Sequence, residues 1–323
     1  MNYQTTQMVD EQAAFGFVTA QGRNMEAAIY SRRYPTFNYA EHVPVVTEGA
    51  PWAIGTQFRL KDHSGQAKII SGKAADMPFG KSTHSLASHD FVMVGAGWEY
   101  SDEEINQGVL YGINVDSDDA MGAADDVERL LYGMAITGNS EVNWTGLTND
   151  ANVQKFDADT TGTSSSTFWS AKTVDNILAD FNAGLEAVRT NSNEVEWADS
   201  VRLPPAAFRL IATKRLGTDG SMGTLLDYVR QNNIYTAETG LPLDIRPLRD
   251  LATASPDGGG RMVVYRRDEQ VLKFHLPMPR RVLPVYRAGL MHYQQGVIAR
   301  TGGTEIRLPG AMAYVDEIAD VPA

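Results

Sequence analysis

The chain contains no cysteine. This absence excludes disulfide bonds, thiolate catalysis, and zinc or iron–sulfur sites built from cysteine ligands. The sequence also lacks an N-terminal basic stretch followed by an apolar core, and no run approaches the roughly 18 apolar residues that a membrane span requires. We therefore expect a protein of cytoplasmic origin that has no secretion signal and does not contact a membrane.

Positive charge is scarce. The chain has 28 Lys and Arg against 40 Asp and Glu, a formal net charge of −12. Surfaces that neutralise DNA phosphates are rich in Lys and Arg, so the composition argues against a DNA-binding face. It is compatible with a container whose wall does not adhere to nucleic acid. With 323 residues, 43% of them hydrophobic, the chain can bury one large core or two moderate ones.

Residues able to carry catalysis are few. His84, His89 and Asp90 lie in a polar, glycine-dotted stretch at 61–90. A His/Asp pair can perform acid–base or metal chemistry, but this histidine spacing is not a usual ligand spacing on a helix, and no third ligand stands nearby. We interpret the stretch as a solvated loop.

Two further motifs suggest ligand binding only superficially. The acidic stretch 116–126 resembles a calcium loop, but it has Met121 where the loop needs Gly and Val127 where it needs Glu. It reads better as a helix start with a charged face. The glycine-rich stretch 217–224 lacks the Lys-Ser/Thr pair of a phosphate-binding loop, so we predict a flexible connection capped by Ser221.

Two surface motifs remain. Asn143 fits the N-glycosylation pattern, and we expect it to be unused in a cytoplasmic protein. Arg280 and Arg281 stand between prolines and can contact phosphate, although inter-subunit salt bridges or a solvated turn are the commoner use. No G-x-S-x-G or H-E-x-x-H motif occurs. We therefore predict that the chain is not an enzyme and assign no catalytic, cofactor-binding or metal residues.

The first third of the chain reads as an arm followed by β structure. Residues 1–48 combine a short helix pattern at Glu11–Gly22 with a stretch that contains prolines and is typical of extended chain. Residues 49–101 alternate in the manner of strands, with about thirty polar residues in the middle. Loops of that length are usually functional or reach outward. The alternating apolar positions are Phe58 and Leu60, and then Val92, Val94, Ala96, Trp98 and Tyr100.

Helix signals follow. Ser101 and Glu104 form a capping box, and a longer amphipathic helix is expected at about 117–137, where Gly138-Asn139 provides a C-terminal stop. Further expected elements are an amphipathic helix over 174–188, a short helix at 222–230, and strands at 243–248, 261–266 and 270–276.

Near the end of the chain, Gly302-Gly303 separates two alternating runs. This pattern predicts a two-residue hairpin turn with positive φ. The implied register sets Arg300 opposite Glu305, Ala299 opposite Ile306 and Val297 opposite Leu308.

Taken in order, these parts resemble the major capsid proteins of tailed bacteriophages, whose Hong Kong 97-type fold is shared by encapsulin nanocompartments. The turn after the long helix carries Gly138-Asn139 and then Gly146-Leu147-Thr148-Asn149, as is common in that family. More closely, the sequence resembles a subfamily of capsid proteins found in phages and prophages. The phrases that carry this resemblance are WTGLTN (144–149), TKRLGTDGSMGTLLDYVRQNNIYTAETGLPLDIRPLR (213–249), MVVYRRDEQVLKFHLPMPRRVLPV (262–285) and GGTEIRLPGAMAYVDEI (302–318).

The resemblance implies an α+β fold with an N-terminal arm, a long two-stranded E-loop, a P-domain with a spine helix, and an A-domain. The expected boundaries are 1–48 for the arm, 49–100 for the E-loop and flanking P-domain strands, 101–170 for the P-domain with the spine helix, 171–269 for the A-domain, and 270–323 for P-domain strands with a final strand that can join the A-domain.

The function implied is that of a structural subunit of the virion. It assembles with itself, as pentamers and hexamers, into an icosahedral shell around phage double-stranded DNA, which it encloses without sequence-specific binding. Assembly is expected in the host cytoplasm, with scaffolding, portal and decoration proteins as further partners, and no cofactor is implied. Alternatives left open are an encapsulin-like compartment, in which Glu11–Gly22 receives a cargo peptide, and a small hydrolase that uses His84, His89 and Asp90.

Two family features are not expected here. Some members cross-link E-loop lysines to a neighbour, and Lys61, Lys68, Lys73 and Lys81 lie in that segment, but no partner asparagine can be identified. Some members begin with a long scaffolding domain, for which an arm of about 48 residues leaves no room. We predict neither cross-linking nor an attached scaffold.

Overall fold

The computed structural model describes residues 37–69, 77, 79–111, 115–216 and 223–320. The chain divides into two units, Met1–Thr36 and Phe37–Ala323, and only the second is described. The helix expected at Glu11–Gly22 and the lysine at position 73 therefore lie outside the described residues.

A five-stranded sheet lies between two hydrophobic clusters. Along its strand β8, Met262 and Val264 belong to one cluster, while Val263 and Tyr265 belong to the other. Strands covered on both faces read as continuous apolar runs, and every residue of β8 is buried. The strands stand in the order β5 (Gln154–Asp157), β14 (Met312–Ala319), β8 (Gly260–Tyr265), β6 (Ser200–Leu203) and β7 (Asp244–Pro247).

Helices pack on one face of this sheet. The predicted amphipathic helix is α4, which begins after its cap Thr173 and buries Ile177, Phe181 and Leu185 at helical spacing. The cap predicted at Ser221 is wrong for the short helix, because Thr224 caps α6 through its side-chain oxygen. The helices are α4 (Val174–Asn191), α5 (Pro205–Thr213), α6 (Leu225–Gln231) and α7 (Ile234–Thr239).

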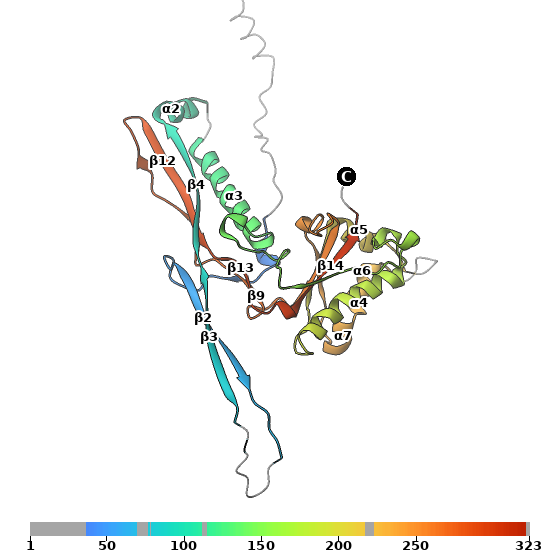
Figure 1. Ribbon diagram of the computed structural model, residues 1–323. Helices are drawn as coiled ribbons and strands as arrows, with labels where there is room; N and C mark the ends of the chain where they lie inside the picture. The colour runs from blue at the N-terminus through green and yellow to red at the C-terminus, as the bar shows by residue number, and fades with distance from the viewer. Residues whose placement is uncertain (1–36, 70–76, 78, 112–114, 217–222, 321–323) are drawn as a thin grey trace, which may run out of the picture. The chain divides into compact units, whose positions relative to one another are not determined.

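The long helix packs on a second sheet (Figure 1). Val127 and Leu131 of α3 join Val94 and Val297 of that sheet in one buried cluster. The elements are α3 (Val115–Ile136), β4 (Val92–Ser101) and β12 (His292–Thr301), paired along their whole length, and β10 (Met278–Val282) and β11 (Tyr286–Arg287) on the other side of β12.

The predicted capping box is confirmed at the start of α2 (Asp102–Tyr111). The Ser101 backbone N–H donates to Glu104 Oε2 at 2.8 Å, and the Glu104 N–H donates to Ser101 Oγ at 3.2 Å. The Ser101 hydroxyl also donates to Glu104 Oε2 at 3.0 Å, and this bond and the one from the Ser101 N–H lower the pKa of the exposed Glu104 carboxyl.

The stop predicted after the long helix is also confirmed. Gly138 has φ +75°, and a Cβ there would lie 2.2 Å from the Trp144 carbonyl oxygen, so only glycine fits. Beyond it, Thr148 Oγ1 donates to the Ile136 carbonyl at 2.9 Å, which closes the turn onto the helix end. Short 3-10 helices are Tyr39–Glu41, Ser140–Val142, Thr163–Ser165, Trp169–Ala171, Arg249–Leu251 and Pro309–Ala311.

The hairpin predicted at Gly302-Gly303 is wrong. β12 pairs with β4, whereas the next strand, β13 (Gly303–Ile306), pairs with β9 (Leu272–His275), which also pairs with β1 (Val45–Val46). The chain leaves one sheet and enters another at this point. Gly303 has φ +69°, while a Cβ on Gly302 would lie 2.7 Å from the Phe91 ring. The two glycines thus allow the chain to pass from one sheet to the other. As a result, Glu305 lies opposite Lys273 and not, as predicted, opposite Arg300.

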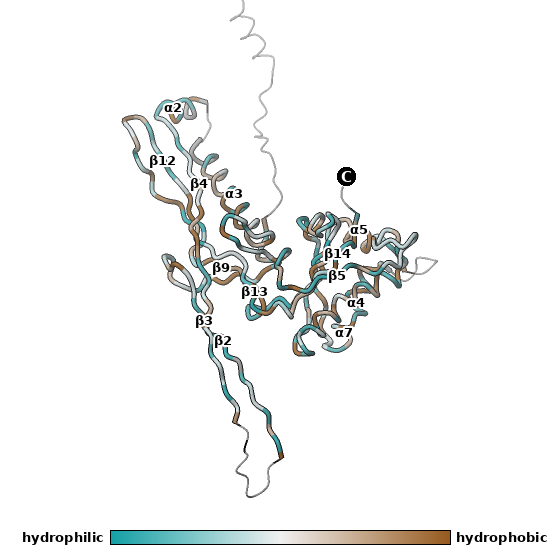
Figure 2. Tube along the Cα trace, viewed as in Figure 1, coloured by the Kyte–Doolittle hydropathy of each residue, from teal (hydrophilic) through white to brown (hydrophobic). Residues whose placement is uncertain are grey.

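The polar stretch predicted as a loop contains a strand. β2 (Gly55–Ser64) and β3 (Lys81–Asp90) form a two-stranded hairpin with continuous register from Gly55↔Asp90 to Ser64↔Lys81. Among the described strands, these two pair only with each other. Figure 2 shows them mostly in the colours of hydrophilic residues. The prediction failed because most residues of this hairpin are exposed and therefore show no apolar alternation.

Candidate assembly surfaces

Aromatic side chains attach the base of the β2–β3 hairpin to the rest of the fold. His89, near the end of β3, stacks on Trp144 with ring centroids 5.8 Å apart and on His275 at 5.2 Å. Its Nε2 lies 2.5 Å from the Gly302 carbonyl oxygen, to which it donates. Because Trp144, His275 and Gly302 come from three separate segments, this one histidine joins the hairpin to the turn after α3, to β9 and to the start of β13.

An ionic group supports the same anchor. Glu305 Oε2 lies 2.7 Å from His275 Nε2 and 3.1 Å from an Arg307 guanidinium nitrogen. Burial works to raise the pKa of the Glu305 carboxyl, but the hydrogen bond from His275 and the charge of Arg307 outweigh burial and lower it. The guanidinium of Arg307 also lies 4.2 Å from the centre of the Phe58 ring on β2. Both hairpin strands are therefore fixed at their base.

Beyond its base the hairpin exposes apolar side chains. Leu86 on β3 is 71% exposed, and Phe79, just before that strand, is 90% exposed. A two-stranded hairpin alone is marginally stable in water, and large apolar side chains left in solvent gain free energy when a partner buries them. The hairpin thus has the properties of a segment that is completed by a partner.

A second apolar surface lies at the ends of β10, β11 and β12. Its members are about half exposed or more and come from one continuous stretch of chain, which distinguishes them from scattered surface residues. The exposed side chains are Val282, Val285, Tyr286, Leu290 and Met291.

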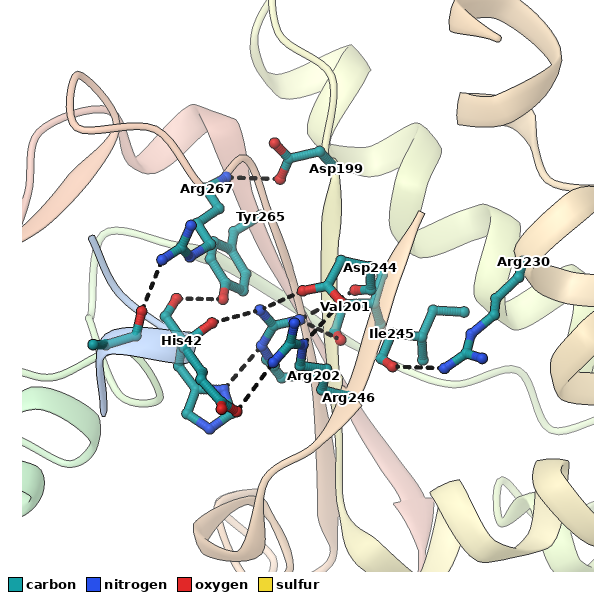
Figure 3. A network of polar contacts seen from close by, with 12 residues as sticks. His42, Asp199, Val201, Arg202, Arg230, Asp244, Ile245, Arg246, Tyr265 and Arg267 are labelled. Carbon is teal, nitrogen blue, oxygen red and sulfur yellow. Dashed lines mark hydrogen bonds and ion pairs between the residues drawn. The ribbon is translucent and has the colours of Figure 1, made fainter. Parts of the chain in front are cut away.

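A buried arginine holds the segment around His42 against the five-stranded sheet (Figure 3). Arg202 of β6 is completely buried, and its Nε donates to His42 Nδ1 at 3.0 Å. Its Nη2 donates to Asp244 Oδ2 at 3.0 Å and to the Glu41 carbonyl at 3.1 Å. The guanidinium therefore has a charged partner and several hydrogen bonds, as a buried cation requires.

Two neighbours complete this network. The Tyr265 hydroxyl donates to the His42 carbonyl at 2.5 Å, and Arg267 donates to the Ala40 carbonyl at 2.7 Å. Burial, followed by the charge of Arg202, lowers the pKa of His42 to about 4. The His42 ring is therefore neutral at pH 7, and its Nδ1 can accept the hydrogen bond from Arg202. Sequence reasoning missed this site because its two central residues are 160 positions apart.

The structure does not bring the candidate catalytic residues together. His84 lies opposite Lys61, Asp90 lies opposite Gly55, and His89 is engaged at the hairpin base. An odd separation along a strand places His84 and His89 on opposite faces. Within the described ranges, no three His, Asp or Glu side chains are grouped so that they could hold a metal ion. The structure therefore does not support the hypothesis of a hydrolase that uses His84, His89 and Asp90 together.

The structure also places most of the other motifs that were considered as ligand or surface sites. The acidic stretch 116–126 is helical within α3, as predicted. Arg280 lies 3.8 Å from Glu128 of α3, so this arginine forms a salt bridge within the chain. Residues 217–222 lie outside the part of the chain that the structure describes. Asn143 follows a 3-10 turn with φ +54°. None of the described helices is long and apolar enough to cross a membrane.

Comparison with known proteins gives a consistent result. A family model described as major capsid protein matches residues 65–318. No curated protein sequence matches the chain.

Solved structures resemble the fold at low sequence identity. The capsid of Myoviridae phage XM1 is similar with a TM-score of 0.77 and 15% identity, covering 93% of this chain and 98% of that one. The capsid of an empty GTA particle gives a TM-score of 0.63 at 13% identity, with 97% and 100% coverage. A chain from Microbacterium phage Oxtober96 gives 0.63 at 10% identity, with 95% and 98% coverage. At these identities the likeness shows the fold, an α+β phage capsid fold.

Proposed function

The chain belongs to the major capsid protein family, and from this premise we propose that it assembles as pentamers and hexamers into an icosahedral shell enclosing phage double-stranded DNA. The family assignment rests on a match over residues 65–318. A capsid protein forms the shell of the virion, and the subunit's main partner is therefore another copy of itself. The low overall positive charge suits a wall that encloses DNA without binding its sequence.

The observation that carries this proposal is the β2–β3 hairpin. It pairs with no other described strand, it is anchored at its base through His89 and Phe58, and it leaves Leu86 and Phe79 in solvent. A monomeric protein gains nothing from such a segment, whereas a shell subunit can lay it on a neighbour and bury it there.

We assign the regions of the fold accordingly. Residues 1–48 are the arm, and the E-loop within 49–100 corresponds to β2 and β3. The P-domain corresponds to α2, α3 and the β4–β12 sheet. The A-domain, centred on 171–269, corresponds to α4–α7 and the five-stranded sheet. The position of β14 between β5 and β8 supports the expectation that the final strand joins the A-domain, and it extends that domain to β5.

Further parts of the proposal concern chemistry and partners. The subunit has no catalytic role, and the buried ion pairs Arg202–Asp244 and Lys172–Asp180 serve the fold. Assembly takes place in the host cytoplasm, with scaffolding, portal and decoration proteins as transient or minor partners. The E-loop lysines form no covalent cross-links.

The test is assembly of the purified full chain. We expect gel filtration to show large particles or capsomer rings, and negative-stain electron microscopy to show closed shells, rings or sheets. A stable monomer or dimer at high protein concentration would contradict the proposal. The content of the purified particles tests the alternative. Particles that hold a protein cargo and no nucleic acid would instead identify an encapsulin-like compartment.

A further inference from the structure

The hairpin has two faces of different character. Cross-strand pairs alternate between the faces, and the face that contains Phe58, Ala87 and His89 is partly buried against the rest of the fold. The opposite face is exposed along the hairpin and is called the outward face. Its members are Gln57, Arg59, Lys61 and His63 of β2, and Ser82, His84, Leu86 and Ser88 of β3, with exposed Asp90, opposite Gly55, at the base.

The segment that contains the hairpin is basic in an otherwise acidic chain. Residues 55–90 hold five Lys or Arg and three Asp, a net charge of +2, which leaves −14 for the other residues of a chain whose total is −12. Arg59 and Lys61 are both exposed on the outward face, where Lys61 lies opposite His84 and Arg59 lies opposite Leu86. Neither cation forms an ion pair with a residue that the structure describes. The middle of the outward face thus combines two unpaired cations with one exposed leucine, and Asp90 lies at its base.

A complementary surface occurs elsewhere in the chain. Residues 99–126 contain nine Asp or Glu and no Lys or Arg. Its described start, which we call the acidic end, comprises Glu99 at the end of β4 and Asp102, Glu103 and Glu104 in the first turn of α2. The Asp102 N–H donates to the Met291 carbonyl at 3.1 Å, so the exposed Leu290 and Met291 lie beside these carboxylates. The acidic end therefore combines negative charge with exposed apolar side chains.

The two surfaces do not pair within one subunit. β3 ends at Asp90 and β4 begins at Val92, and the ten residues of β4 separate the hairpin base from the acidic end by about 33 Å at the usual strand rise. No ion pair joins the two surfaces among the described residues. At the acidic end Glu99 Oε2 lies 3.3 Å from His292 Nε2 of the same chain, whereas Asp102, Glu103 and Glu104 form no ion pair with a described residue and remain open to another molecule.

We propose that the outward face of the hairpin docks on the acidic end of a second copy of this chain. Arg59 and Lys61 meet the carboxylates of Glu99, Asp102 and Glu103, and Leu86 packs near the partner's apolar side chains. The inference rests on the proposed function, and it adds which face of the hairpin is used and which surface receives it.

Charge gives this contact its specificity. Copies that each carry a net charge of −12 repel one another at long range, so a locally basic face that meets an acidic surface defines the approach and excludes other orientations. Exposed ion pairs are individually weak and are screened by salt. The contact can therefore form and dissociate repeatedly during assembly, and the ion pairs of this contact weaken as ionic strength rises.

The direct test is zero-length carbodiimide cross-linking of the full chain, which joins a lysine amine to a carboxylate in contact with it. Mixing isotope-labelled and unlabelled chains before the reaction distinguishes links between copies from links within one. We expect mass spectrometry to find Lys61 joined to the peptide that contains residues 99–104, in mixed-isotope pairs. Links of Lys61 to other carboxylates alone, or only within one copy, would overturn the proposal.

A matched pair of charge reversals provides the second test. Lys61→Glu changes the outward face, whereas Lys81→Glu changes the same residue type on the other face of the same hairpin. We expect Lys61→Glu to raise the protein concentration needed for assembly about tenfold, and Lys81→Glu to leave it within about twofold. Adding Glu103→Lys to the Lys61→Glu chain reverses one charge on each of the two docking surfaces and should restore assembly.

The two proposals fail in different ways. If the wild-type chain forms shells but the two reversals have equal effects and Glu103→Lys gives no rescue, the docking assignment is wrong and the capsid function stands. If the wild-type chain remains monomeric and shows no cross-link between copies, both proposals fail.

Discussion

The five-stranded sheet and the β2–β3 hairpin are both β structure, yet they obtain their stability from different sources. In the sheet, successive residues of the central strand β8 enter two separate hydrophobic clusters, so every residue of that strand is buried. In the hairpin, most side chains are exposed, and only the base contacts the remainder of the fold. Backbone pairing is unbroken in the hairpin and shifts register between β14 and β8 of the sheet, so regular pairing is not the source of the sheet's greater burial.

This difference separates folding from assembly. A substitution in the sheet removes packing or ion pairing that the subunit has already made, and it should lower the free energy of unfolding of the single chain. A substitution on the outward face of the hairpin removes contacts that exist only between copies. It should leave the subunit's stability nearly unchanged and affect the shell.

The largest effect is expected at a buried ion pair of the sheet. Arg261 Nε and Nη2 donate to the two carboxylate oxygens of Asp316 at 2.6 and 2.8 Å, and both side chains are buried. Asp316→Ala leaves a buried guanidinium without its counter-charge, which costs about 3–5 kcal/mol. Urea denaturation of the unassembled subunit measures this loss.

The matched control is Asp157→Ala on the neighbouring strand β5. Asp157 lies opposite Asp316 in register but is exposed. Its loss should change the free energy of unfolding by no more than about 0.5 kcal/mol. Equal effects of the two substitutions would contradict the view that burial of the ion pair makes Asp316 important.

A leucine-to-alanine pair compares the two regions directly. Leu185 on α4 is completely buried under the sheet, and Leu86 on the hairpin is 71% exposed. Leu185→Ala should cost about 3 kcal/mol in the free energy of unfolding, because it removes buried methyl groups and leaves a cavity. Leu86→Ala should cost less than about 0.5 kcal/mol but weaken assembly measured by light scattering. If Leu86→Ala destabilised the isolated subunit as strongly as Leu185→Ala, the comparison would fail.

A smaller, pH-dependent effect is expected where His42 meets the sheet. Burial and Arg202 lower its pKa to about 4, from 6.5 for an ordinary histidine. Between these values the unfolded chain binds more protons than the folded one, so the free energy of unfolding decreases as the pH falls from 7 to 4. The histidine's contribution to this decrease is about 2 kcal/mol at pH 5.

His42→Gln isolates this contribution. Glutamine has no proton to gain in this range, and its side-chain oxygen can still accept from Arg202. Denaturation curves of both chains at pH 7 and pH 5 should show a smaller pH-dependent loss in the variant. Identical losses would show that His42 does not titrate as its surroundings indicate.

Much of the helical structure was predictable because its signals are local. Ser101 and Glu104 form the predicted capping box, Gly138 ends the long helix, and the apolar spacing of α4 is present in the sequence itself. Each of these signals depends on residues within about one helical turn, so one sequence suffices to detect it.

The strands were less predictable because alternation does not identify a partner. The runs on either side of Gly302-Gly303 fit a hairpin, but they pair with β4 and β9. The β3 strand escaped detection because it buries almost nothing within the subunit, and the period-2 pattern records burial. The Arg202–His42 contact left no signal, because neither residue has a neighbour in sequence that suggests the other.

The amino-acid sequence by itself determined the absence of cysteine chemistry, the helices with their caps, the acidic balance, and the order of segments that is typical of a capsid subunit. The tertiary structure alone decided which strands pair, that one sheet separates two cores, and that Arg59 and Lys61 share a face turned away from the rest of the subunit. The physical reason is range. Helix signals act between residues three or four apart, whereas strand pairing and buried polar networks join residues far apart in the sequence, 160 positions for Arg202 and His42, whose proximity exists only in the folded chain.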